Sequence, residues 1–239
     1  MSNPSPKRFY KTAAPVEVGA RWTVALDGRP LKTPAKADFF VDRQDLAEAV
    51  AEEWNRQGEI LDLTGMHLTR LINVVIDRTP SARPGLVEEI VRYCETDLLC
   101  FPPIGENRDR ILEAWRPIRS WAAETLKIAL NEAEGEHLLI GQPAASLEAS
   151  RGYADACDDL DLTTLGFAAG LYGSALLAMA VCEGYLEAGE AYELSILEEA
   201  GQAEKWGWDP EAVARHDARR QEIAVVQTVF SRQAKNISQ

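Results

Sequence analysis

The chain has 239 residues, 46% of them hydrophobic and 26% charged, and a formal net charge of −13 at pH 7. This length and composition are typical of a globular protein that buries a large core without disulfides or metal ions, which excludes a disordered chain or a disulfide scaffold. The negative charge disfavours binding to nucleic acid and favours a partner with a basic patch, although acidity that only keeps the protein soluble would also explain it.

The first forty residues have the pattern of short antiparallel strands. Aromatic and β-branched residues gather in four segments, separated by turn signals, at 8–13, 16–18, 21–26 and 37–41. The sequence D-G-R-P at 27–30 follows an alternating run, and Asp-Gly in that position is a strong signal for a tight hairpin. The N-terminal part is therefore predicted to form a small antiparallel sheet.

From residue 42 the apolar spacing changes to that of a helix. Leu46, Val50 and Trp54 fall on one stripe, which predicts a helix packed on the sheet, and Gly58 stands where a C-cap glycine would. The opposite side of this helix is expected to face solvent. Its polar residues are Glu52, Glu53, Arg56 and Gln57.

A second helix is predicted over residues 68–78, and the turn-like sequence T-P-S-A-R-P-G follows it. We place a domain boundary there, near residue 80. This gives an N-terminal α+β domain at 1–80 and a C-terminal domain at 81–239.

The C-terminal part is predicted to be all helical, because its apolar residues follow a helical period and no strand pattern appears. Pro117 should kink or divide the second of these helices. Residues 165–182 are nearly as long and apolar as a minimal membrane span, but their acidic flanks and lack of Lys or Arg anchors predict a buried core helix. The predicted helical segments are 87–95, 108–126, 146–157, 165–182, 197–207 and 211–224.

Signatures of catalysis are few. The four cysteines include no C-x-x-C pair, which disfavours a zinc site or a disulfide framework, and the three histidines lack metal-ligand spacing and are expected to be structural or solvated. No phosphate-binding loop or serine-nucleophile motif is present, although two carboxylates brought together by the fold could still form a hydrolase. The four cysteines are Cys94, Cys100, Cys157 and Cys182, and the three histidines are His67, His137 and His216.

The segment L-E-E-A-G-Q-A-E-K-W-G at 197–207 is the strongest candidate for a binding surface. On a helix Glu198, Gln202 and Trp206 share one face, with Glu199 beside them. Tryptophan is enriched among interface hot spots, and Glu or Gln beside it can accept hydrogen bonds from a partner's Arg or Lys. The alternative is that Trp206 packs into the bundle while the glutamates face water.

Five stretches in chain order carry a resemblance to a known family: L-D-G-R-P-L-K-T-P-A at 26–35, L-A-E-A-V-A-E-E-W-N-R-Q at 46–57, M-H-L-T-R-L-I-N-V-V-I-D at 66–77, T-D-L-L-C at 96–100, and the segment at 197–207. Together they resemble the assembly chaperones that handle the alpha subunit of the F-type ATP synthase, found in mitochondria and alphaproteobacteria. The resemblance implies a small α+β domain joined to a helical domain, as the residue patterns also predict.

The resemblance further implies a non-enzymatic protein that binds the unassembled alpha subunit and shields its beta-subunit interface. The residues at 198, 199, 202 and 206 would contact this client, and no cofactor, metal, nucleic acid or membrane insertion is expected. No targeting peptide is visible, so we expect the protein in a bacterial cytoplasm. We also expect it to be a monomer. A hydrolase using Glu198 or Glu199 would instead need a concave pocket and a raised carboxyl pKa, and an acidic scaffold would bind assembled partners.

Overall fold

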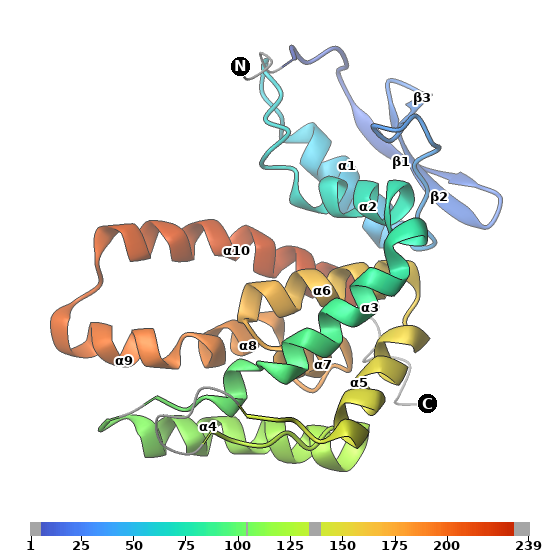
Figure 1. The fold of residues 1–239 in the computed structure, drawn as a ribbon. Coiled ribbons are helices and arrows are strands. Elements are labelled where there is room, and N and C mark those ends of the chain that lie inside the picture. Colours follow the sequence, from blue (N-terminus) through green and yellow to red (C-terminus); the bar gives the residue numbers. More distant parts are fainter. Residues whose placement is uncertain (1–5, 104, 134–139, 232–239) are drawn as a thin grey trace. The chain divides into compact units, whose positions relative to one another are not determined.

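The computed structural model describes residues 6–103, 105–133 and 140–231 (Figure 1). The chain divides into two compact units, Met1–Ala82 and Arg83–Gln239. The predicted α+β class is confirmed: an antiparallel three-stranded sheet lies in the N-terminal unit, and the described residues of the second unit form helices and connections without a strand.

The sheet of the first unit consists of β1 (Ala13–Val18), β2 (Arg21–Leu26) and β3 (Arg29–Pro30), in the order β1-β2-β3. The predicted hairpin joins β2 to β3. Its two central residues, Asp27 and Gly28, have φ values of 47° and 82°, and positive φ at both positions is what a type I′ turn requires.

Two of the expected strands do not form. Residues 8–12 stay outside the sheet, because the Arg8 guanidinium donates to the carbonyl oxygens of Tyr10 (3.1 Å) and Lys11 (2.8 Å), which a ladder would otherwise use. Residues 37–41 make only isolated bridges to Lys32 and Trp22. The strand prediction for 8–13 and 37–41 is therefore wrong, apart from Ala13.

The first two helices are α1 (Gln44–Asn55) and α2 (His67–Asp77). As predicted, the stripe of Leu46, Val50 and Trp54 is buried, and α1 packs on β1 and β2. The predicted C-cap at Gly58 is wrong, because α1 ends three residues earlier. There the Asn55 amide exchanges two hydrogen bonds of 2.8 Å with the backbone of Ala13 in β1 and fixes the helix end.

Glu53 is not a solvated residue, contrary to the prediction. Its carboxylate accepts hydrogen bonds from the backbone N–H groups of Leu68 and Thr69, both 2.8 Å, and from the Thr69 hydroxyl at 2.6 Å. The first N–H groups of a helix have no intrahelical acceptor, and Met66 before α2 offers no side-chain cap. Glu53 therefore caps α2 from the neighbouring helix.

The boundary between the units falls within α3 (Thr79–Glu95). The elements that follow are η1 (Leu98–Cys100), α4 (Arg108–Trp121), a π turn η2 (Ala122–Leu126), α5 (Ala144–Ala156), α6 (Asp159–Tyr172), α7 (Ala175–Cys182), α8 (Ala188–Ser195), α9 (Leu197–Trp206) and α10 (Pro210–Phe230). The turn expected at 79–85 is instead the start of α3. Pro80 lies in its first turn, where a missing N–H leaves no bond unmade, and the helix continues through Pro84. Likewise α4 continues through Pro117 and is not divided there.

The apolar segment at 165–182 is buried as predicted, but it forms two helices rather than one. Gly173 takes a left-handed φ of 65° and ends α6, and the Ser174 hydroxyl then accepts a hydrogen bond from the Leu177 N–H and begins α7. All eight residues of α7 are buried. No helix among the described residues has the length and hydropathy needed to cross a bilayer.

Asp97 anchors the start of α7 in the core. The fully buried carboxylate accepts from the Leu99 N–H (3.1 Å), the Ser174 hydroxyl (2.7 Å) and the Leu176 N–H (3.0 Å). Burial raises the pKa of Asp97 to about 6, although its hydrogen bonds oppose that shift. The T-D-L-L-C stretch thus has a structural function.

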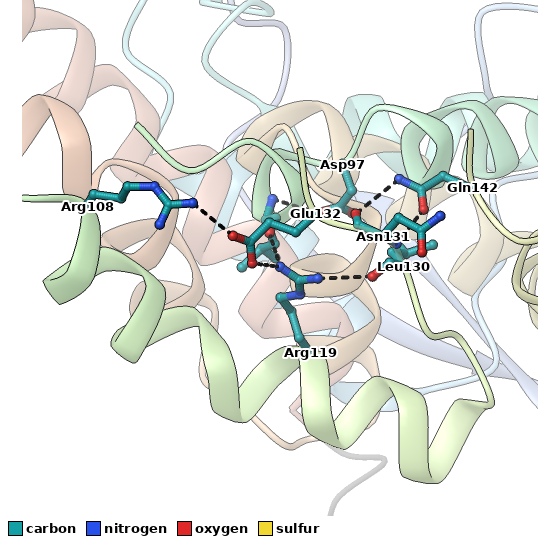
Figure 2. A network of polar contacts seen from close by, with 8 residues as sticks. Asp97, Arg108, Arg119, Leu130, Asn131, Glu132 and Gln142 are labelled. Carbon is teal, nitrogen blue, oxygen red and sulfur yellow. Dashed lines mark hydrogen bonds and ion pairs between the residues drawn. The ribbon is translucent and has the colours of Figure 1, made fainter. Parts of the chain in front are cut away.

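Arg119 of α4 connects η1 to the chain at 127–133 (Figure 2). Its guanidinium donates to the carbonyl oxygens of Leu99 (3.1 Å) and Leu130 (3.0 Å) and pairs with Glu132 at 2.8 Å. Arg108 reaches the second oxygen of the same carboxylate at 3.2 Å. These contacts fix the irregular chain at 127–133 against α4.

Candidate functional site

The candidate segment forms α9, a peripheral helix of the second unit. Figure 1 shows α9 leading away from α8, and the loop after it turns the chain back into α10. Gly201 is the one buried residue of α9. A Cβ at this position would lie 2.5 Å from the Asn107 amide nitrogen, so the glycine allows α9 to approach the start of α4 closely.

Two ion pairs join α9 to another segment of the second unit. Glu204 pairs with Arg110 (3.1 Å) and Lys205 pairs with Glu106 (2.5 Å), so both tie the helix to the region where α4 begins. Each of these four side chains is more than half exposed, and solvent screens such pairs strongly. These two ion pairs therefore contribute little to the position of α9, which has one buried residue, Gly201.

A cavity of about 650 Å³ lies beside α9, between this helix, the first turns of α10 and the chain before α4; we call it the α9 cavity. The four residues singled out in the sequence, Glu198, Glu199, Gln202 and Trp206, all line it. The structure thus brings the predicted site residues together at one concave surface.

The two glutamates have different surroundings. Glu199 is half-buried, pairs with Arg215 of α10 at 2.5 Å, and lies 3.6 Å from Nε2 of His216. Glu198 and Gln202 are exposed, and neither makes a hydrogen bond or ion pair to another part of the chain that the structure describes. Glu198 and Gln202 are consequently available to a partner, whereas Glu199 mainly joins α9 to α10.

Trp206 does not belong to the core. Its side chain is 71% exposed at the end of α9, so the alternative in which it packs into the bundle is wrong. Trp208, 44% exposed, lines the same cavity and was not singled out in the sequence. The signal for it was the following Asp209-Pro210, a helix start that predicts a short connection after Trp206.

His216 has a partly structural role. Its Nδ1 lies 2.5 Å from the Tyr192 hydroxyl, its ring meets the edge of Trp208 at a centroid distance of 4.8 Å, and its buried Nε2 has no hydrogen-bond partner. His67 is half-buried at the start of α2, and His137 lies outside the described residues.

Within 6–103, 105–133 and 140–231, no group of His, Cys, Asp and Glu side chains could hold a metal ion. Burial raises the pKa of the four cysteine thiols, which keeps them in the weakly reactive protonated form.

The chemistry of the α9 cavity suits binding better than acid–base catalysis. The cavity is concave, as a hydrolase would need, but three of its four carboxylates already have partners. Glu106 pairs with Lys205, which lowers its pKa, Glu199 pairs with Arg215, and Asp209 caps α10 by accepting from the Glu211 N–H. A general acid requires a raised carboxyl pKa, so the shift at Glu106 has the opposite sign.

Comparisons with known proteins give a consistent result. A sequence model described as ATP12 chaperone protein matches residues 7–123. The mitochondrial protein atp12 of Schizosaccharomyces pombe is 24% identical over 220 residues, which cover 87% of this chain and 76% of that protein. Among solved structures, the Atu1473 protein of Agrobacterium tumefaciens is 33% identical with a TM-score of 0.88, over 95% of this chain and 85% of that one. Atp12 of Paracoccus denitrificans is 31% identical with a TM-score of 0.81, over 94% and 96% of the two chains.

Proposed function

The chain belongs to the ATP12 chaperone family, and from this premise we propose that it is an assembly chaperone of the F-type ATP synthase. It binds the unassembled alpha subunit, shields the surface that later meets the beta subunit, and releases the alpha subunit when beta arrives. It acts in the cytoplasm as a monomer, without a cofactor and without catalysing a reaction.

The observation that carries this proposal is an exposed indole beside polar groups that have no partner among the described residues. Trp206 is 71% exposed, and Glu198 and Gln202 line the same cavity. An exposed tryptophan with adjacent hydrogen-bonding groups is typical of interface hot spots. Glu199 lines the cavity as well, and through Arg215 it keeps α9 in place.

A shielding function also has a physical reason. A ring subunit without its neighbours exposes a large apolar interface, and such surfaces aggregate. A chaperone that covers the interface with a few strong contacts delays aggregation, and the native neighbour displaces it by burying more surface.

The decisive experiment is light scattering of purified alpha subunit on dilution from denaturant, with this protein present and then with beta subunit added. We expect scattering to fall in proportion to the chaperone and an alpha–beta complex to form after beta arrives. An unrelated acidic protein of similar size and charge is the control for a general charge effect. Undiminished scattering at several-fold excess, with no co-elution of alpha, would show that the alpha subunit is not the client.

A further inference from the structure

The α9 cavity carries an uncompensated negative charge. Its described lining holds two cations, Lys205 and Arg215, and each already faces its own carboxylate, Glu106 and Glu199 respectively. The Glu198 carboxylate has no such partner in the described residues, although it lies on the same wall. A cationic group of another molecule is therefore its natural complement.

Two indoles stand at the same cavity. Trp206 ends α9 and Trp208 precedes α10, with Gly207 between them at a φ of 81°. This left-handed conformation favours glycine and lets the chain turn between the helices while both indoles line the cavity. Indole faces attract cations, and they do so most strongly where water is partly excluded.

We propose that the α9 cavity accepts an arginine side chain of the client, stacked on an indole and bonded to Glu198 and Gln202. This inference rests on the proposed function for the identity of the client. Arginine fits better than lysine, because its planar guanidinium can stack and at the same time donate to two acceptors placed one helical turn apart. The volume of about 650 Å³ leaves room for the residues that flank the arginine.

The first part of the test measures the affinity of the full-length chain for refolding alpha subunit. Glu198→Gln and Trp206→Ala should each weaken binding by about 5- to 30-fold, since the first removes the negative charge and the second the aromatic ring that attract the cation. Glu211→Gln is the matched control: Glu211 is an exposed glutamate of the adjoining α10 that does not line the cavity and whose side chain has no ion pair among the described residues. Raising the salt concentration should weaken the wild type more than Glu198→Gln.

The second part uses a probe that does not depend on the client. Nα-acetyl-arginine methylamide is titrated into the labelled protein, and the indole N–H signals are followed by NMR, with Trp206→Phe and Trp208→Phe used to assign two of the six tryptophans. Both signals should move saturably, and the citrulline analogue, which has the same shape but no charge, should leave them in place.

The two parts separate the two ideas. If the alpha subunit binds normally to Glu198→Gln and Trp206→Ala, and the arginine probe moves neither indole signal, the arginine site is wrong while the chaperone function stands. If the probe moves both signals but the wild type does not bind alpha, the site chemistry stands and the proposed client is wrong.

Discussion

Reversing the charge of Glu199 should destabilise the second unit, whereas the same change one residue earlier should not. Glu199 pairs with Arg215, and the two side chains are 37% and 53% exposed, so screening limits the pair to about 1 kcal/mol or less. Glu199→Lys removes this attraction and adds a repulsion of similar size, about 1–2 kcal/mol in all. For a unit of this size the melting temperature should fall by roughly 2–8 °C.

Differential scanning calorimetry of three variants tests this reasoning. Glu198→Lys is the control, because Glu198 has no partner in the described residues, and it should melt like the wild type. The charge swap Glu199→Lys with Arg215→Glu restores opposite charges and should recover most of the loss. Equal melting of Glu198→Lys and Glu199→Lys, or a charge swap that melts lower than Glu199→Lys alone, would refute the assigned function of the ion pair.

Three other predictions concern stability. Glu53→Ala should lower the free energy of unfolding, measured in urea, by roughly 1 kcal/mol because it removes the cap of α2. Glu52→Ala, a change on the exposed side of α1, should stay within about 0.5 kcal/mol of the wild type. Equal losses in the two variants would contradict the cap. Gly152→Ala, in open space within α5, should stabilise the protein by up to about 1 kcal/mol. Gly201→Ala should stabilise it less, because the new Cβ would lie 2.5 Å from the Asn107 side-chain nitrogen and would displace that side chain. Equal gains would argue against the close approach. Because the pKa of Asp97 is raised from 3.8 to about 6, the folded state holds a proton between these pH values that the unfolded state has released. The stability of the wild type relative to Asp97→Asn should therefore fall by up to about 3 kcal/mol as the pH rises from 4 to 7. Parallel pH profiles of the two proteins in urea unfolding would contradict this.

Features that depend on adjacent residues were predictable from the sequence. The Asp27-Gly28 hairpin follows from two residues that tolerate positive φ, and the α1 stripe follows from a spacing of four residues. The burial of the apolar segment was also predictable, but its division was not recognised. Gly173-Ser174 combines a C-cap and an N-cap in two residues, which is the local signal for a break that apolar periodicity conceals.

Features that depend on distant residues could not be predicted. Glu53 has the sequence context of a solvated helix residue, and its function as a cap arises because the fold brings Leu68 to it. In the same way Glu198 and Glu199 have similar sequence contexts, and the sequence does not show that Arg215 of the next helix pairs with Glu199, while Glu198 has no partner in the part of the chain that the structure describes. A sequence pattern can identify a candidate face of a helix, but tertiary contacts determine which of its residues are paired within the protein and which are available to a partner.

The sparse burial of α9 is compatible with the proposed binding and release of a client. Gly201 is the only buried residue of α9, and Ala212 is the only one in the first half of α10, whereas all eight residues of α7 are buried. Segments with few buried contacts open at a small fraction of the global free energy of unfolding. The α9 cavity can therefore adjust to the proposed arginine side chain without disturbing the core around Asp97.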